Sequence, residues 1–121
     1  MSRLHLALNT HYFDDSVHFY QTLFGREPAK LKPGYAKFDV SDPALNLTLT
    51  ASPETINREA INHLGVEVIN SEAVHAADER LRAEGLPTFF QDTVDCCYSV
   101  QDKTWVTDPN GHNWEFFVVK D

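Results

Sequence analysis

The stretch Asn62-His63-Leu64-Gly65-Val66-Glu67-Val68 decides the fold, because it repeats the pattern of Leu4-His5-Leu6-Ala7-Leu8-Asn9 near the start of the chain. Both segments alternate with the period of two that is typical of a half-buried β-strand. His5 and His63 therefore fall on corresponding faces of equivalent strands. This correspondence indicates that the chain contains the same structural unit twice.

A helix is predicted after each of these strands. Asp14-Asp15-Ser16 supplies capping oxygens and negative charge at a helix start, and Gly25 can end that helix in a left-handed turn. Ser71-Glu72 opens the second helix, and Gly85 ends it before Pro87. The apolar stripes of the two helices are expected to cover the leucine and valine faces of the strands. The opposite strand faces, which carry both histidines, are not covered by these helices and are left to line another feature of the fold.

Short strands follow each helix. They are predicted at 35–40 and 45–50 in the first half and at 104–107 and 113–119 in the second. The last two are joined by Asp108-Pro109-Asn110-Gly111, a strong turn signal. The pattern predicts an α+β fold in which two βαβββ modules form a cupped mixed sheet. We expect one domain over residues 1–121, with repeat units at about 1–52 and 60–121.

Glu115 is expected on the same face as His5 and His63. A carboxylate and two imidazoles from three separate strands match the facial triad that holds ferrous iron and leaves coordination positions open. A lone histidine on a strand is usually a packing or surface residue, but duplication makes that reading less adequate here. We therefore predict a metal site. The histidines expected not to bind metal are His11, His18, His75 and His112.

Cys96 and Cys97 are the only cysteines of the chain and stand side by side in a polar stretch. Adjacent cysteines close a disulfide only with strain, so a structural bridge is disfavoured. Two thiolates suit chelation of a soft ion such as trivalent arsenic, mercury or cadmium. The alternative is that one or both are small buried hydrophobic residues. The surrounding segment 86–103 is interpreted as a loop that carries the thiols to the metal.

The net charge of the chain limits the classes of partner that it can bind. Eighteen acidic and 10 basic side chains give a net charge of −8, which disfavours nucleic acid and anionic membranes. The chain start has no signal-peptide pattern and no segment reaches membrane-spanning length, so we expect a cytoplasmic protein with reduced thiols. The sequence leaves open whether the modules close within one chain or exchange across a homodimer.

With these residues in place, the chain resembles the vicinal oxygen chelate superfamily over its whole length. That superfamily includes glyoxalase I, extradiol dioxygenases, and bleomycin and fosfomycin resistance proteins. Within it, the chain is similar to the carbon-arsenic lyase and cadmium-induced protein branch. The segments that carry this closer resemblance are Lys32-Pro33-Gly34-Tyr35-Ala36, Asn62-His63-Leu64-Gly65-Val66-Glu67-Val68, Cys96-Cys97 and Gln101-Asp102-Lys103-Thr104-Trp105-Val106-Thr107.

The resemblance implies an Fe(II)-dependent dioxygenase that cleaves the carbon-arsenic bond of a small trivalent organoarsenical and releases arsenite. Methylarsenite and reduced aromatic arsenicals are the implied substrates, and dioxygen is the co-substrate. The implied ligands of Fe(II), for which Ni, Mn, Co or Zn can substitute, are His5, His63 and Glu115. The residues expected at the substrate are the catalytic pair Cys96 and Cys97, together with Tyr98, Lys103 and Trp105.

Two other functions fit the same residues. One is a different metalloenzyme of this fold, a thiol transferase or glyoxalase-like isomerase that uses Mn, Zn or Ni as a Lewis acid. The other is a non-catalytic protein that binds cadmium, arsenite or a drug through its cysteine pair. The fold does not decide among them, because function lies in the site. Oxygen dependence separates the first alternative, and absence of turnover separates the second.

Overall fold

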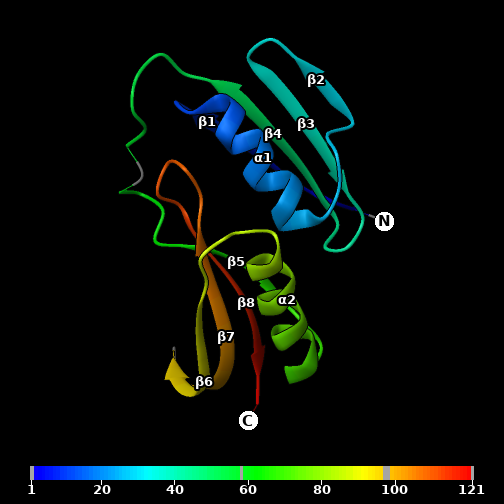
Figure 1. Cartoon of the computed structure of the whole chain (residues 1–121), viewed down its shortest axis with the longest axis vertical. Coiled ribbons are helices and arrows are strands. Elements are labelled where there is room, and N and C mark those ends of the chain that lie inside the picture. The colour runs from blue at the N-terminus through cyan, green and yellow to red at the C-terminus, as the bar shows by residue number, and fades with distance from the viewer. Residues whose placement is uncertain (1, 58, 97–98, 121) are drawn as a thin grey trace. The chain divides into compact units, whose positions relative to one another are not determined.

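The structure is a computed structural model that describes residues 2–57, 59–96 and 99–120 (Figure 1). The chain divides into two compact units, which are described separately. The first unit comprises Met1–Ala60 and Asp108–Gly111, and the second comprises Ile61–Thr107 and His112–Asp121. Each unit has one helix and one four-stranded mixed sheet. This confirms the predicted α+β fold of two βαβββ modules.

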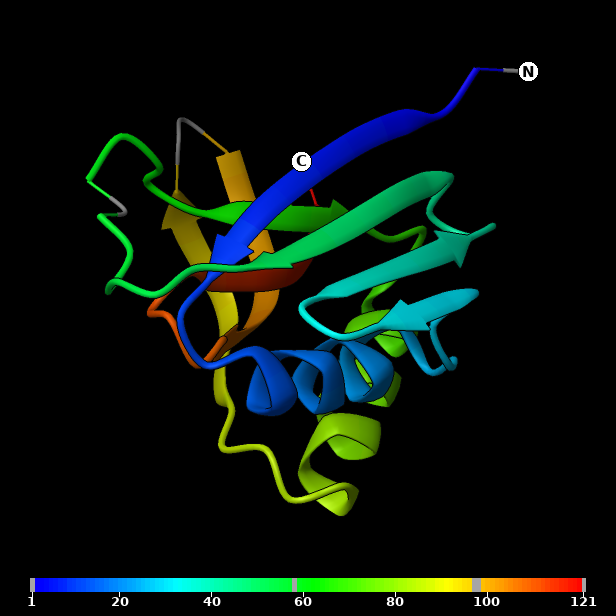
Figure 2. The same ribbon diagram turned by 90° about the horizontal axis from the view of Figure 1, so that it is seen from above.

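The first unit begins with the duplicated strand and its helix. Its elements are β1 (Leu4–Thr10), α1 (Phe13–Phe24), β2 (Lys30–Lys32), β3 (Tyr35–Val40) and β4 (Leu45–Ala51). The strand order is β1-β4-β3-β2, with β1 parallel to β4 and the other pairs antiparallel. Figure 2 shows α1 along one face of this sheet. Tyr20 and Leu23 of α1 are fully buried, as are Leu47 and Leu49 of β4, so the core lies between them.

The turn Asp108-Pro109-Asn110-Gly111 belongs to the first unit, although it connects strands of the second. The Tyr20 hydroxyl donates a buried hydrogen bond to Asp108 Oδ2 at 2.6 Å. Asn110 accepts from the His11 backbone N–H at 3.0 Å and donates to Thr10 Oγ1 at 2.6 Å. The turn thus satisfies polar groups at the junction of β1 and α1, a role that its sequence as a turn did not indicate.

The second unit repeats the order of the first. Its elements are β5 (Leu64–Glu67), α2 (Ser71–Ala83), β6 (Phe89–Cys96), β7 (Ser99–Thr107) and β8 (Asn113–Val119). The strand order is β5-β8-β7-β6, and β5 runs parallel to β8. The Asn70 side chain caps α2 by accepting from the Ala73 N–H at 2.8 Å. Val74 and Leu81 of α2 are fully buried, so the predicted apolar stripe forms this core.

The loop predicted over 86–103 is wrong. β6 and β7 pair as a long antiparallel hairpin whose register extends to Cys96 and Ser99. The hairpin was missed because polar residues interrupt the apolar alternation along both strands, and hydrogen bonds within the unit compensate for them. A β-bulge between Gln91 and Val94 further breaks the period of two on β6.

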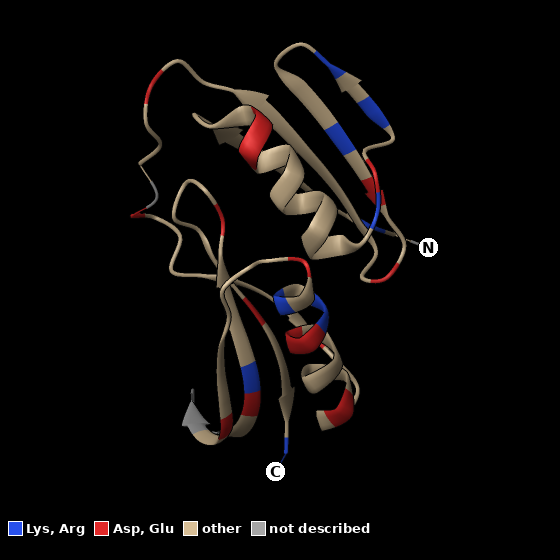
Figure 3. Cartoon of the chain, in the orientation of Figure 1, with Lys and Arg blue, Asp and Glu red and all other residues tan. Residues whose placement is uncertain are grey.

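Figure 3 shows acidic residues in both units and basic residues on β2, β3 and β7 among other places. The absence of a nucleic-acid partner stays a prediction from the net charge of −8. In the described part of the chain, no helix combines the length and apolar character needed to cross a bilayer.

Candidate metal centre

One register row of the second sheet carries the candidate centre. Glu115 of β8 lies opposite Gly65 of β5 on one side and opposite Trp105 of β7 on the other. Trp105 in turn lies opposite Phe89 of β6. Directly paired residues share a face of the sheet, and His63, two positions before Gly65, falls on the same face. The row therefore gathers a carboxylate, an imidazole and an aromatic wall.

His63 and Glu115 are in direct contact. His63 Nε2 lies 2.9 Å from Glu115 Oε2, and the Glu115 side chain is only 4% exposed while that of His63 is 37% exposed. The other ring nitrogen, Nδ1, lies 2.6 Å from Asn62 Oδ1, so a neighbouring amide helps to orient the imidazole. The expectation that these two residues share a face is therefore met by their geometry.

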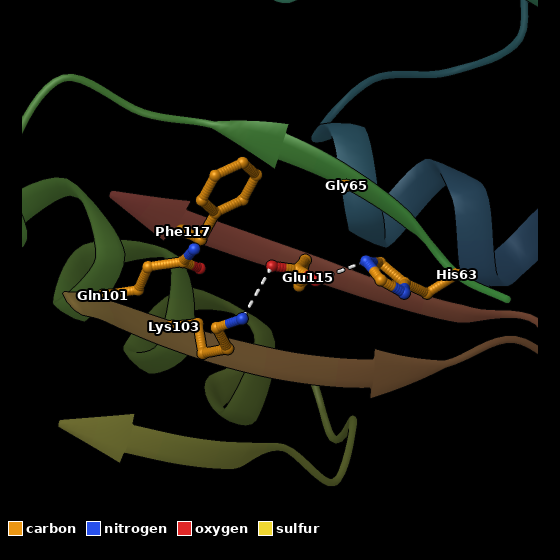
Figure 4. A pocket seen from close by; sticks show the side chains of 6 residues that line it. All are labelled: His63, Gly65, Gln101, Lys103, Glu115 and Phe117. Carbon is orange, nitrogen blue, oxygen red and sulfur yellow. Dashed lines mark ion pairs between the residues drawn. The ribbon is translucent and has the colours of Figure 1, made fainter. Parts of the chain in front are cut away.

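The pair lines an open pocket of about 340 Å³ (Figure 4). The lining residues are His63, Gly65, Gln101, Lys103, Glu115 and Phe117. Figure 4 shows the carboxylate of Glu115 between the imidazole of His63 and the ammonium of Lys103. A small molecule that enters this pocket therefore meets the Glu115 carboxylate and the Lys103 ammonium.

Lys103, which the sequence predicts at the substrate, also contacts the proposed metal ligand Glu115, and this contact was not predicted. Its Nζ lies 3.2 Å from Glu115 Oε1, and the two side chains are 2% and 4% exposed. A buried charge requires a partner of opposite sign, so each of the two compensates the other. Because Lys103 occupies Oε1 and His63 occupies Oε2, the carboxylate presents its two oxygens to different neighbours. The signal was available in the alternation of β7, which places Lys103 and Trp105 on one face.

Trp105 forms a wall beside the pair. Its indole Nε1 donates to Gln91 Oε1 at 3.0 Å, which fixes the orientation of the ring. The His63 ring packs edge-on against it, with centroids 5.2 Å apart and an interplanar angle of 80°. Lys103 Nζ lies 5.3 Å from the Trp105 ring centroid, a cation–π contact. Trp105, predicted at the substrate, is thus next to His63 and Lys103, two of the polar residues that line the pocket.

The remaining predicted site residues belong to the first unit or lie at or beyond the limit of the described residues. His5 is exposed on β1 of the first unit, with Nδ1 3.2 Å from the Asn46 carbonyl oxygen. Cys96 is the last residue of β6, and Cys97 and Tyr98 lie outside the described residues. No group of three or more His, Cys, Asp or Glu side chains suited to a metal is found among residues 2–57, 59–96 and 99–120. His5 as a third ligand stays a prediction.

The donor chemistry of the described pair fits a metal. Imidazole nitrogen and carboxylate oxygen are the ligands that suit divalent iron, manganese, cobalt, nickel and zinc. His63 Nε2 and Glu115 Oε2 face each other at 2.9 Å within a pocket, so both atoms can turn to one ion. The second oxygen of Glu115 keeps its contact with Lys103, which favours a carboxylate that binds through one oxygen.

Fold and site together define a family. The chain belongs to the Glyoxalase/Bleomycin resistance protein/Dioxygenase superfamily, whose model matches residues 2–116. The predicted resemblance is therefore confirmed. More particularly, the chain is 48% identical over 119 residues to the cadmium-induced protein CadI of Mycobacterium tuberculosis, covering 98% of this chain and 77% of CadI. It is 47% identical over 121 residues to the trivalent organoarsenical cleaving enzyme of Thermomonospora curvata, covering 99% and 79%.

Solved structures share the fold. A glyoxalase/bleomycin resistance protein/dioxygenase from Alicyclobacillus acidocaldarius matches with a TM-score of 0.78 at 18% identity, covering 99% of this chain and 92% of that one. A variant of the fosfomycin resistance protein FosX from Listeria monocytogenes, complexed with Mn(II), matches with a TM-score of 0.67 at 19% identity, covering 95% and 87%. At these identities the likeness concerns the fold alone.

Proposed function

We propose that the chain is an Fe(II)-dependent dioxygenase that cleaves the carbon-arsenic bond of trivalent organoarsenicals and releases arsenite. The observation that carries the proposal is the His63–Glu115 pair, 2.9 Å apart in a pocket of the same sheet whose β6 strand ends at Cys96. Membership of the superfamily and the 47% identical relative named for organoarsenical cleavage support an enzyme acting on a small molecule.

His63 and Glu115 would hold the metal, with His5 of the first unit as the third proposed ligand. When bound, ferrous iron supplies the activation of dioxygen that no side chain can perform. The chain supplies ligand geometry and charge. Lys103 neutralises one oxygen of the buried Glu115 carboxylate and leaves the other available.

The thiol pair would bind the arsenic. Each thiol of Cys96 and Cys97 gives up its proton to a hydroxide that leaves the dihydroxy form of the arsenical, so each new As–S bond releases one water. Arsenic stays trivalent in this exchange, and two sulfurs from adjacent residues provide a chelate. Capture of this kind brings the carbon substituent to a fixed place, and such proximity supplies much of the rate.

The pocket offers two further contacts to a bound arsenical. The Trp105 indole presents an apolar wall whose orientation is fixed by Gln91. The Lys103 ammonium, buried against Glu115, supplies a hydrogen-bond donor on the same face. We therefore assign both residues, with Tyr98 from outside the described chain, to substrate binding.

Anaerobic reconstitution tests the proposal. The protein is loaded with Fe(II) without oxygen, methylarsenite is added, and air is then admitted while released arsenite is measured by ion chromatography. We expect arsenite only after air and only with Fe(II). Release without oxygen in the presence of Zn or Mn would instead identify a Lewis-acid enzyme.

The 48% identity to a protein named for its induction by cadmium favours one second candidate, a binding protein for soft cations. In that case cadmium would bind stoichiometrically and compete with methylarsenite for the thiol pair, and no arsenite would appear under any condition. Arsenite release with multiple turnovers would exclude pure sequestration.

A further inference from the structure

A buried carboxylate that the proposed chemistry does not use contacts the β6–β7 hairpin at the β-bulge of β6. Asp102 of β7 is 2% exposed. Its Oδ2 accepts from the Ser71 hydroxyl at the start of α2 at 2.6 Å. Its Oδ1 accepts from the Thr93 backbone N–H on β6 at 2.8 Å and from Lys120 Nζ, just after β8, at 3.3 Å. One side chain thus links α2, β6 and the end of the chain.

The backbone that Asp102 holds on β6 is strained. Thr93 has a φ of 51°, and no other residue except glycine has a positive φ in the part of the chain that is described. A β-branched residue adopts this left-handed conformation only when its surroundings impose it. Asp102 accepts the Thr93 N–H, and Lys120 Nζ donates to Thr93 Oγ1 at 2.8 Å. The cluster therefore holds the backbone N–H and the side-chain hydroxyl of the strained residue.

Thr93 lies in the bulge that sets the register of the hairpin end. Gln91 pairs with Lys103, and the next pair is Val94 with Gln101, so β6 advances three residues while β7 advances two. From there the register continues to Cys96 opposite Ser99. Without the bulge every residue after it would shift by one place and exchange faces of the sheet. The bulge therefore sets the register of β6 from Val94 to its end at Cys96.

The Asp102 carboxylate is suited to holding the backbone N–H of Thr93 in the bulge. Burial raises the pKa of its carboxyl, but the hydrogen bonds from Ser71, from the Thr93 backbone and from Lys120 hold that pKa well below the usual value. The group therefore stays ionised at neutral pH, and an ionised carboxylate is the stronger acceptor. Its neighbour Lys103 points to the opposite face and serves Glu115.

We infer that Asp102 is a positioning residue, which anchors the bulge at Thr93 and thereby fixes the register of β6 as far as its end at Cys96, the first of the two cysteines proposed to bind one trivalent arsenic. The inference rests on the proposed function only in making arsenic the ligand of the thiol pair. A chelate needs both sulfurs at a set separation and direction, whereas reaction of a single thiol does not. Loosening the anchor should weaken chelation and leave single-thiol reactivity nearly unchanged.

The test compares Asp102→Asn with Asp92→Asn in the full chain, free of metal and oxygen. Asp92 lies next to Thr93 but is 68% exposed, is 3.9 Å from Lys120, and accepts at 3.0 Å from the Thr93 hydroxyl and not from its backbone N–H. It is therefore a control for loss of a carboxylate beside the bulge that leaves the Thr93 backbone contact in place. The probe is phenylarsine oxide, measured by its dissociation constant, beside the rate of alkylation by iodoacetamide. Loss of a charged hydrogen-bond acceptor should weaken phenylarsine oxide binding by roughly tenfold in Asp102→Asn, against less than about twofold in Asp92→Asn.

Two further variants guard against a general folding defect. Thr93→Gly keeps the backbone N–H and tolerates positive φ, so it should bind phenylarsine oxide about as well as the native chain. Ser71→Ala removes one donor to Asp102 and should show a smaller loss in the same direction. Co(II) affinity, which reports His63 and Glu115, should stay within about twofold of native in both Asp102→Asn and Ser71→Ala.

Hydrogen exchange at the Thr93 amide separates this inference from the proposed function. It should accelerate in Asp102→Asn whether or not arsenic binds. Native affinity for phenylarsine oxide in Asp102→Asn, an unchanged Thr93 exchange rate, or an equal loss of Co(II) affinity would overturn the anchor. If the native chain itself fails to chelate phenylarsine oxide, the proposed function fails, while the exchange measurement still decides the role of Asp102.

Discussion

A Cβ atom at Gly65 would lie 2.9 Å from Cγ of Glu115 and 3.2 Å from its carbonyl oxygen. Real Cβ atoms essentially never come as close as 2.9 Å to another atom, so β5 can lie this close to Glu115 only because residue 65 is glycine. The glycine thus belongs to the candidate metal centre through the space that it leaves.

The first prediction follows from this contact. Gly65→Ala should displace Glu115 and lower Co(II) affinity by roughly tenfold, at a cost in stability of about 1–3 kcal/mol. Gly85→Ala is the control, because it has open space but a φ of 91°, so it should lose stability without losing metal affinity. Metal titration and urea denaturation measure the two effects. Native Co(II) affinity in Gly65→Ala would contradict the role of this contact.

The second prediction concerns the proposed ligands. His63→Ala and Glu115→Ala should each weaken Fe(II) binding by at least about 100-fold, more than the loss of an outer hydrogen-bond partner, and His5→Ala should come close to this. His18→Ala is the control, since His18 is exposed on α1. Anaerobic Fe(II) titration gives the affinities. Full Fe(II) affinity in His63→Ala would contradict the assignment of His63 as an iron ligand.

The third prediction concerns Lys103. Lys103→Met leaves the Glu115 carboxylate buried without its cation, which should destabilise the metal-free protein by about 3 kcal/mol. A divalent ion held by Glu115 supplies positive charge at the same place, so saturating Co(II) should recover much of that loss. Urea denaturation with and without Co(II) measures both states. The same destabilisation in both would show that Lys103 acts independently of a metal.

The two βαβββ modules could be predicted because alternation and helix caps are local signals. Gly25 ends α1 with a φ of 65°, as expected. The capping oxygens predicted at Asp14-Asp15-Ser16 are wrong, because the helix begins at Phe13 and its N-cap residue, Tyr12, makes no side-chain cap hydrogen bond. The β6–β7 hairpin could not be predicted in the same way. Asp102 and Lys103 interrupt the apolar pattern, and each is tolerated only because of partners brought near by the sheet register. Such partners lie on other elements. The alternation of β7 therefore places Lys103 on the face of Trp105 but does not identify Glu115 as its partner, and the bulge at Thr93 has no local signature.

The fourth prediction is a pH dependence of stability that arises from Asp78 on α2. Burial raises the pKa of its carboxyl, but hydrogen bonds from Thr88 and Thr104 and the charge of Arg82 outweigh burial and lower it below the ordinary 3.8. A lowered folded-state pKa stabilises the fold above the unfolded value, and this stabilisation is lost as the pH falls through the folded value.

Asp78→Asn should therefore be less stable than native at neutral pH, by about 1–3 kcal/mol. The difference should shrink as the pH falls below 3.8. Denaturation midpoints over an acid series measure it. The control is Glu79→Gln on the exposed face of the same helix, for which a constant, small difference is expected. A gap for Asp78→Asn that grows in acid would contradict the assignment.

The last prediction separates arsenic capture from metal binding. Cys96→Ser and Cys97→Ser should each lose methylarsenite binding and turnover while Fe(II) affinity stays nearly native, because a hydroxyl is harder than a thiol and stays protonated. The proposed iron ligands lie outside β6, so methylarsenite binding should be lost without loss of Fe(II) binding. Isothermal titration with each ligand, on the same protein preparation, provides the measurement.

The oxidation state of arsenic supplies the internal control for that experiment. Trivalent methylarsenite carries exchangeable oxygen ligands that thiolates can replace, whereas pentavalent methylarsenate holds its oxygens as an oxyanion and offers a soft ligand no labile position. Native protein should therefore bind the first and not the second, and both serine variants should bind neither. A double serine variant that converts methylarsenite at the native rate would instead return Cys96 and Cys97 to the role of ordinary small residues, and the reaction would then have to be explained by the pocket of His63, Lys103 and Glu115 alone.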